Sequence, residues 1–310
     1  MPTDRKKICQ TVVEILIVGK RVEGEKEMAK VLYGKPVIDS IKGDLIGRIK
    51  NLKVHGVAPG LAILRAGERP DDIAYEQRLS TLCESLGIRQ RTMEVDRSVS
   101  QYDLLDALES LNRRDDVHGI IVFRPLPDHI DDDVICDRIY VDKDIDCMNP
   151  DNLKGLFTGR RKAFAPCTAE AVIELLDFYG YDLDGANVVI INRSLVVGKP
   201  LTVLMLGRNA TVMVCHSHTK NIKAITRSAD ILITGTGNAE YLGPDYVSSK
   251  TVVIDVGINF TEDGRMTGDV DFEAVCEKAA AVTPVPKGIG GVTSAILLRH
   301  IIESAERYIW

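Results

Sequence analysis

The sequence predicts a two-domain α/β protein in which one domain is built on a doubly wound parallel sheet. Two observations carry this prediction. The chain has 310 residues, a length at which a single hydrophobic core has usually stopped growing and a second domain forms. After Pro166, short continuous apolar runs alternate with helical stretches, and such runs are typical of parallel strands that helices bury on both faces.

The composition narrows the class of protein. Hydrophobic residues make up 45% and charged residues 27% of the chain, which excludes disordered and collagen-like proteins. Lys and Arg number 39 against 45 Asp and Glu, so the net charge is -6, without a long block of one sign. We therefore expect no nucleic-acid partner and no membrane surface as partner, and a small anionic ligand would need a local basic site.

The seven cysteines are odd in number, dispersed and never arranged as C-x-x-C. This pattern predicts neither a disulfide framework nor a zinc site, so we expect no metal and reduced thiols in a cytoplasmic protein. The apolar run Val12–Val18 is too short to span a bilayer, and no cleavage pattern follows it. No export signal or anchor is expected. The cysteines are Cys9, Cys83, Cys136, Cys147, Cys167, Cys215 and Cys276.

In the first half, helical spacing of apolar residues alternates with short apolar runs. The elements expected there are helices over Ile38–Val54 and Tyr75–Leu86, and strands over Leu61–Leu64 and Gly119–Val122. Gly87 is a predicted C-terminal cap of the second helix. The two prolines of Arg124–Pro127 forbid further strand pairing and predict an ordered turn.

In the second half, apolar runs and helical stretches alternate more regularly. The domain boundary near residue 165 is inferred from that change alone. The elements expected there are helices over Ala169–Tyr179 and Thr293–Tyr308, and strands over Val188–Ile191, Thr211–Cys215, Ile231–Thr234 and Val252–Val256.

The turn after Val188–Ile191 is a candidate dinucleotide site. In a doubly wound sheet a diphosphate binds at this first strand-to-helix turn, because helix N-terminal N–H groups favour an anion. The usual G-x-G-x-x-G is absent, and the turn runs from Asn192 to Pro200. Arg193 and Ser194 offer side-chain donors, and Gly198 allows close approach of backbone and ligand. The alternative is a strand-to-helix turn without a ligand.

The end of the next strand bears on the choice of dinucleotide. NAD sites place an acidic residue here for the ribose 2′-hydroxyl, whereas NADP sites offer a cation. No acidic residue occurs between Ala210 and Ser228, and the strand ends in Cys215-His216-Ser217-His218-Thr219-Lys220. We expect Arg193, Ser217 and a nearby histidine or lysine to accept a 2′-phosphate, so NADP is favoured and NAD is possible. The alternative is a solvated polar turn.

Several motifs in a fixed order carry a family resemblance. They are Arg193-Ser194-x-x-Val197-Gly198-x-Pro200, Cys215-His216-Ser217-x-Thr219, Ile254-Asp255-Val256-Gly257, Gly268-Asp269-Val270-Asp271 and Thr283-Pro284-Val285-Pro286. On these residues the chain resembles the methylenetetrahydrofolate dehydrogenase/cyclohydrolase family. The resemblance implies a Rossmann-type NAD(P)-binding domain, a folate-binding α/β domain completed by the C-terminal helix, an active cleft between them, and a homodimer.

The resemblance also divides the chain. It implies a catalytic domain over residues 1–164, whose first 30 residues are an unplaced extension, a Rossmann domain over 165–291, and a last helix over 292–310 that packs back on the catalytic domain.

Site residues follow from the same resemblance. Tyr75 would stack on the folate, and Asp146 would hold the pterin amino group and ring nitrogen; these two are the candidate catalytic residues. The other substrate candidates are Pro125, Gly288, Gly290 and Thr293, and a reading without ligand makes Thr293 the cap of the last helix. The cofactor candidates are Asn192, Arg193, Ser194, Gly198, His216, Ser217, Gly235, Gly237 and Ile258.

Two departures from the family bear on its hydrolytic step. The position of the family's lysine, four residues after the tyrosine, is Leu79, and the position of its glutamine partner is Phe123. Leucine neither donates a proton nor polarises water. We therefore expect a dehydrogenase that converts 5,10-methylenetetrahydrofolate to 5,10-methenyltetrahydrofolate with NADP and has weak or absent cyclohydrolase activity.

Three alternatives stay open. In the first, the chain is an ordinary bifunctional dehydrogenase/cyclohydrolase, in which Arg78, Arg124 or a repositioned water replaces the lost groups. In the second, it is a non-catalytic paralogue that binds nucleotide or folate. In the third, it is a dehydrogenase of the same architecture that acts on another small substrate.

Overall fold

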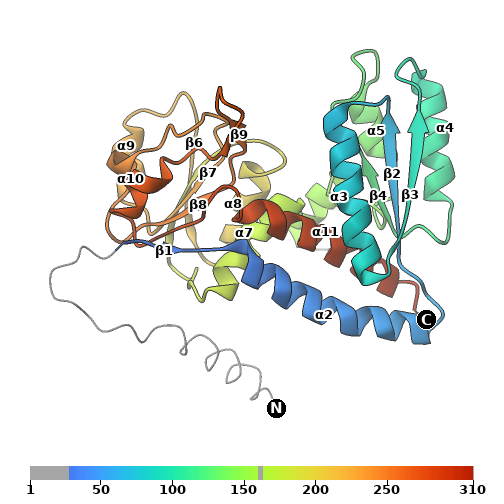
Figure 1. Cartoon of the computed structure of the whole chain (residues 1–310), viewed down its shortest axis with the longest axis horizontal. Helices are drawn as coiled ribbons and strands as arrows, with labels where there is room; N and C mark the ends of the chain where they lie inside the picture. Colours follow the sequence, from blue (N-terminus) through green and yellow to red (C-terminus); the bar gives the residue numbers. More distant parts are fainter. Residues whose placement is uncertain (1–27, 160–162, 310) are drawn as a thin grey trace.

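The computed structural model describes residues 28–159 and 163–309, which form two α/β lobes, each built on a parallel sheet (Figure 1). The predicted fold class is confirmed. Most of the extension expected over residues 1–30 lies outside the described residues. The helices of the described residues do not include one that is long and apolar enough to cross a membrane.

The smaller lobe contains a three-stranded sheet in the order β3-β2-β4, with both pairings parallel. Its elements are β2 (Gly60–Ala66), α3 (Pro70–Leu86), β3 (Arg89–Val95), α4 (Gln101–Asn112), β4 (Gly119–Val122), α5 (Asp132–Arg138) and α6 (Pro150–Thr158). Helix α3 begins five residues before the predicted start, because Pro70 suits the first helical position and Asp71 and Asp72 favour the positive end of the helix dipole.

Strand β2 is buried on both faces. Leu61 and Ile63 belong to the same core cluster as Leu79 of α3, whereas Ala62 and Leu64 belong to the cluster that contains the apolar face of α4. Because side chains alternate along a strand, α3 and α4 cover opposite faces of the sheet.

The larger lobe contains a six-stranded parallel sheet in the order β1-β11-β8-β7-β5-β6. Its strands are β1 (Lys30–Val31), β5 (Asn187–Ile191), β6 (Thr211–Cys215), β7 (Ile231–Thr234), β8 (Val252–Asp255) and β11 (Ala281–Val282). The connections carry α8 (Gly198–Leu206), α9 (Ile222–Arg227), η1 (Pro244–Tyr246), the hairpin β9 (Asn259–Phe260) and β10 (Met266–Thr267), and α10 (Phe272–Cys276). The bounds predicted for β6 and β7 are confirmed. Strands β1 and β11 were not predicted, because two residues show no periodicity.

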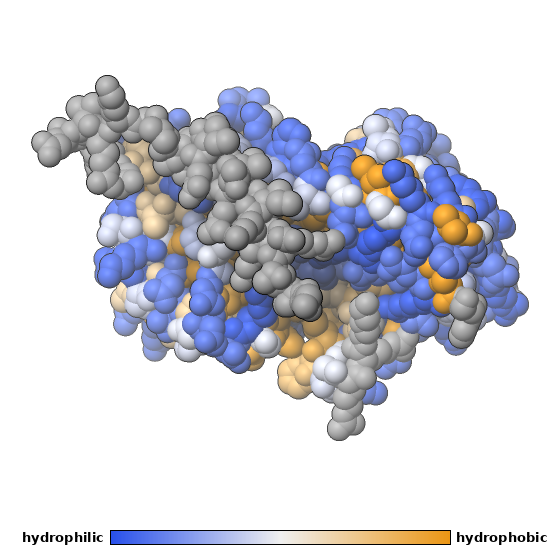
Figure 2. Space-filling model, turned by 90° about the horizontal axis from the view of Figure 1, so that it is seen from below, coloured by the Kyte–Doolittle hydropathy of each residue, from blue (hydrophilic) through white to orange (hydrophobic). Residues whose placement is uncertain are grey.

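Three helices join the lobes. Helix α11 (Ile289–Glu306) packs on α2 (Gly34–Val54) and α7 (Cys167–Phe178), and it also contacts β2 and β4 (Figure 1). Helix α2 turns one apolar stripe inward. Figure 2 shows the molecule from below, where hydrophilic residues predominate among the described atoms, with smaller hydrophobic patches between them.

The predicted start of the last helix is wrong. Helix α11 begins at Ile289, four residues earlier than expected, and its N-terminal flanking residue is Gly288, without a side-chain cap. Thr293 therefore lies inside the helix, where its hydroxyl donates to the carbonyl of Ile289. Of the glycines in this first turn, Gly291 serves close packing: a Cβ on Gly291 would lie 2.7 Å from Cδ1 of Ile38 on α2.

Candidate active site

A cavity of about 630 Å³ lies at the carboxyl ends of β5, β6 and β7. In a doubly wound sheet this edge is where nucleotides bind. The structure brings five of the predicted cofactor residues together here: Asn192, Arg193, His216, Ser217 and Gly235. Sequence reasoning missed five others that line the same cavity, namely Ile222, Thr236, Asn238, Ala239 and Tyr241.

Asn192 organises the first turn of this cavity. Its Oδ1 accepts hydrogen bonds from the backbone N–H groups of Ser194 (2.8 Å) and Gly198 (3.0 Å), and also from the hydroxyl of Ser194 (2.8 Å). A Cβ on Gly198 would lie 2.0 Å from the carbonyl oxygen of Asn192, so the turn closes only with glycine there. Ser194 and Gly198 therefore shape the turn rather than line the cavity.

Asp269 holds the second loop of the cavity. Its carboxylate accepts hydrogen bonds from the Thr234 hydroxyl (2.9 Å), from the backbone N–H of Thr236, and from the backbone N–H of Gly237 (3.2 Å). Gly237 has φ +73°, a left-handed conformation that favours glycine. Gly237 thus sets the path of the loop, and its neighbours Gly235 and Thr236 line the cavity.

A second cavity, of about 340 Å³, lies between the two lobes. Tyr75 and Arg78 reach it from α3, Ile258 follows β8, and residues of the loop before α11 close it. The predicted substrate residues Gly288, Gly290 and Thr293 line this cavity together with Tyr75. Ile258, predicted as a cofactor residue, lines it as well, so a cofactor residue and the substrate residues share this space.

The two departures from the family are adjacent to this cavity. Leu79 is fully buried in the hydrophobic core, on the inner face of α3. Phe123 is also buried, and its ring centroid lies 5.4 Å from that of Tyr75, with the planes tilted by 34°. Neither side chain supplies a polar group. The cavity's cations are instead Arg78 and Lys287, and Lys287 has φ +85°, which is strained for a residue with a side chain.

Asp146 lines a third cavity, of about 390 Å³, and not the one lined by Tyr75. Arg124, next to the candidate Pro125, lines this third cavity, as do Leu195 and Val196 of the nucleotide turn. The two candidate catalytic residues nevertheless interact: burial raises the pKa of the Tyr75 hydroxyl, and the charge of Asp146 raises it further. Burial also raises the pKa of Asp146, against hydrogen bonds from Cys167 and the positive charges of His300 and Arg124.

The neighbouring Asp144 has a structural role. Its buried carboxylate accepts hydrogen bonds from the backbone N–H groups of Met148 (2.8 Å) and Asn149 (2.9 Å), and from the side-chain amide of Asn152 (2.7 Å). Asp144 is thus fully buried, whereas Asp146 lines the cavity of about 390 Å³.

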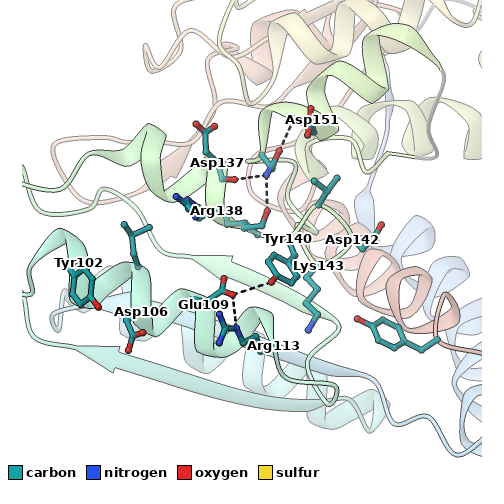
Figure 3. Close-up of a pocket in the computed structure, with 15 residues that line it drawn as sticks. Tyr102, Asp106, Glu109, Arg113, Asp137, Arg138, Tyr140, Asp142, Lys143 and Asp151 are labelled. Carbon is teal, nitrogen blue, oxygen red and sulfur yellow. Dashed lines mark hydrogen bonds and ion pairs between the residues drawn. The ribbon is translucent and has the colours of Figure 1, made fainter.

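The largest of these cavities, about 920 Å³, is an open groove beside α4 and contains none of the predicted site residues (Figure 3). Its polar side chains bind one another: Glu109 accepts from Tyr140 (3.2 Å) and Arg113 (2.8 Å). The amine of Lys143 donates to the backbone carbonyls of Asn112 and Arg114, both at 2.6 Å, and so caps α4. Size alone does not make this groove the functional site.

The fold and cavities define a two-domain α/β protein with a dinucleotide-type turn beside an interlobe cavity. Residues 32–146 match the catalytic domain of tetrahydrofolate dehydrogenase/cyclohydrolase, and residues 166–309 match its NAD(P)-binding domain. The chain therefore belongs to the tetrahydrofolate dehydrogenase/cyclohydrolase family.

Named relatives cover almost the whole described chain. The bifunctional protein FolD of Clostridium botulinum (strain Hall) is 50% identical over 280 residues, which are 90% of this chain and 99% of the relative. The structure of the bifunctional FolD methylenetetrahydrofolate dehydrogenase/cyclohydrolase from Campylobacter jejuni superposes with a TM-score of 0.88 at 39% identity, covering 90% of this chain and 99% of that one.

A second similar structure carries ligands. It is the Trypanosoma brucei methylenetetrahydrofolate dehydrogenase-cyclohydrolase complexed with NADP cofactor and inhibitor, with a TM-score of 0.84 at 33% identity over 90% of this chain and 98% of that one. The expectation of weak or absent cyclohydrolase activity finds no support in these relatives. Their names favour the bifunctional alternative.

Proposed function

We propose that this protein oxidises 5,10-methylenetetrahydrofolate to 5,10-methenyltetrahydrofolate with NADP, and that it hydrolyses the methenyl product in the same interlobe cavity. One observation carries the proposal: Tyr75 of the smaller lobe and Ile258 of the larger lobe line one cavity, and the larger lobe also contains the cavity lined by Arg193 and Ser217. The bifunctional names of the relatives support the second activity.

The residues divide the work of the oxidation. Arg193 and Ser217 would bind the 2′-phosphate, and the ring of Tyr75 would orient the pterin face, while the Asp146 carboxylate would accept from its amino group and ring nitrogen. When bound, NADP accepts the hydride that leaves the methylene carbon. The protein's contribution is then orientation and the exclusion of water, for which a lysine at position 79 is not required.

Hydrolysis of the methenyl cation needs a water that loses a proton and a group that takes it. Leu79 is buried and apolar, and a guanidinium is a poor general base. Lys287 carries the amine among the cavity residues, so we assign the proton transfers of the hydrolytic step to Lys287.

Steady-state assays test the proposal. The purified protein is given methylenetetrahydrofolate with NADP or with NAD, and NADPH or NADH formation is followed by absorbance; methenyltetrahydrofolate hydrolysis is followed separately. We expect both activities and a preference for NADP. Oxidation without hydrolysis above the uncatalysed rate would overturn the second half of the proposal. Ligand binding without turnover would indicate a non-catalytic paralogue.

The proposal includes the division of the chain. Residues up to 164 would form the catalytic domain, 165–291 the nucleotide domain, and 292–310 the helix that returns to the catalytic domain. The contacts of α11 with β2 and β4 support the last point, whereas the pairing of β1 with β11 gives residues 30–31 to the nucleotide sheet.

We further propose a homodimer in the cytoplasm. The six cysteines of the described residues are free and buried, which is consistent with a reducing compartment. Light scattering coupled to size-exclusion chromatography tests the dimer, since a monomer of this chain has a mass of 34.1 kDa.

A further inference from the structure

A buried histidine lies behind the candidate substrate residue Asp146. His300 of α11 is 1% exposed. Its Nδ1 lies 2.7 Å from the carbonyl oxygen of Ile145, and its Nε2 lies 2.9 Å from Oε2 of Glu170 on α7. A carbonyl and a carboxylate only accept hydrogen bonds, so both ring nitrogens donate and the ring is an imidazolium.

The charge of this imidazolium is balanced locally. Glu170 also accepts from Nη2 of Arg299 at 2.6 Å, and Nη1 of Arg299 donates to Glu174 at 2.6 Å, so two cations meet two carboxylates. Burial by itself lowers the pKa of His300, but the hydrogen bond and charge of Glu170 outweigh burial and raise it. Burial favours neutral Glu170, yet His300 and Arg299 lower its pKa to about 2.

Packing of α7 on α11 does not explain such a cluster. Replacing a buried ion pair by apolar side chains of similar volume is often neutral or stabilising. The two helices already share a large apolar contact, to which Val172, Leu176 and Leu297 belong. A function beyond packing is therefore indicated.

The cluster reaches Asp146 through two hydrogen-bond partners. The Ile145 carbonyl, which accepts from His300, also accepts from the thiol of Cys167 at 3.4 Å, and Asp146 is the next residue. The backbone N–H of Cys167 donates to Oδ1 of Asp146 at 3.3 Å. The peptide before Asp146 and its carboxylate are thus held between the first turn of α7 and the middle of α11.

Other charged and titratable groups act on the same two residues. The groups that act on His300 are Asp146, Cys167, Glu170 and Glu303, and Arg299 binds the same Glu170. The groups that face Asp146 are Tyr75, Arg124, Asp144, Cys147, Cys167 and His300. His300 and Arg124 are the cations of the second set, and Arg124 is also paired with Asp132 at 2.9 Å.

We propose that His300 is a positioning residue for Asp146: its positive charge favours the carboxylate form of Asp146, and its hydrogen bond to the Ile145 carbonyl directs that carboxylate at the folate. This inference rests on the proposed function, in which Asp146 binds the pterin. Glu170 contributes to the same positioning of Asp146, because its carboxylate keeps His300 protonated.

Two substitutions remove the charge, and each keeps one of the two hydrogen bonds. In His300→Asn the amide reaches the position of Nδ1 and keeps the bond to Ile145, whereas in His300→Gln it reaches the position of Nε2 and keeps the bond to Glu170. Both variants lose the charge. We expect the apparent pKa on the acidic side of the kcat/KM profile for methylenetetrahydrofolate to rise by about one unit in both. KM for the folate rises about tenfold and that for NADP stays unchanged.

Two further variants complete the comparison. Glu170→Gln should also raise the apparent pKa of the acidic limb, because His300 then loses the carboxylate charge that favours its protonated form. His118→Asn is the matched control: His118 is also buried, at 3% exposure, but its Nδ1 accepts from the backbone N–H of Gly60 at 3.1 Å, away from Asp146. We expect its pH profile to match the wild type.

A titration of the Asp146 carboxyl carbon by NMR, assigned with Asp146→Asn, makes the test independent of turnover. Inactive wild-type protein would refute the proposed function, while the titration would still decide whether His300 acts on Asp146. Folded His300 variants with an unchanged Asp146 titration, and with an unchanged pH profile where there is activity, would overturn the inference and leave His300 a packing residue.

Discussion

Asn192 ties the two loops of the nucleotide cavity together, because its side-chain amide donates to the carbonyl oxygen of Gly235 at 2.6 Å. The same side chain organises the turn up to Gly198. Asn192 begins the first strand-to-helix turn, directly after β5, and Gly235 follows the neighbouring strand β7. One side chain therefore sets the spacing of the two walls of the cavity.

We predict that Asn192→Ala raises KM for NADP at least tenfold and leaves KM for the folate within about twofold. The variant removes the bond to Gly235 and leaves the N–H groups of Ser194 and Gly198 without their acceptor. Ser194 is exposed and water can replace the acceptor there, whereas Gly198 is buried, and an unmet buried group costs about 1–3 kcal/mol. Steady-state kinetics measure both constants. Asn187→Ala, at the opposite end of β5, is the control and should behave as wild type. Equal effects in the two variants would contradict this account.

The preference for NADP is expected to depend on Arg193. In Arg193→Gln the ratio of kcat/KM for NADP to that for NAD should fall about 10- to 100-fold, because a charge-assisted hydrogen bond to phosphate contributes about 1.5–3 kcal/mol. Turnover with NAD should hardly change. Lys250→Met removes an exposed cation before the amino end of β8, outside the set that lines the cavity, and serves as the control. An unchanged ratio in Arg193→Gln would assign phosphate binding to other residues.

Lys287→Met should lower methenyltetrahydrofolate hydrolysis more than tenfold while the dehydrogenase rate stays within about threefold, since general acid–base groups contribute about 10²- to 10⁴-fold. Lys287→Gly removes the same amine and relieves the positive φ, so its Tm should rise while hydrolysis still falls. Leu79→Met, a volume-conserving change in the core, is the control for both activities. Full hydrolysis in both Lys287 variants would exclude this residue.

The buried imidazole of His118 should make the protein less stable in mild acid. Burial first, and then the charges of Lys143 and Arg89, lower the pKa of His118 from 6.5 to about 4. Between these values the unfolded chain binds a proton that the folded chain rejects, so the free energy of unfolding falls as pH decreases from 6.5 to 4, by up to about 3 kcal/mol.

The variant His118→Asn lacks this proton. It should be less stable than wild type at pH 7, because the edge-to-face contact with the Tyr308 ring is lost, and the difference should shrink as the pH falls to 4.5. Urea denaturation at several pH values measures the effect. Parallel stability curves for the two proteins would show that His118 does not titrate in this range.

The core strands and the nucleotide turn could be predicted from the sequence because both are local. Thr211–Cys215 and Ile231–Thr234 are short apolar runs between turns, and a buried parallel strand needs little more. Likewise, Asn192, Arg193, His216 and Ser217 follow strands of one sheet, so their meeting at one edge follows from topology. The absence of a polar group at position 79 could also be predicted from the sequence, because it depends only on the identity of one residue.

Contacts between distant segments were decided by the tertiary structure. The hydrogen bond of His300 to Ile145 joins residues 155 positions apart, and no local pattern indicates that α11 returns between the lobes to make it. The early start of α11 was hidden for the same reason: Gly290 and Gly291 disfavour a helix locally, and close packing against Ile38 of α2 overrides that preference. Periodicity reports which face of a segment is buried, whereas the partner of that face depends on the path of the whole chain.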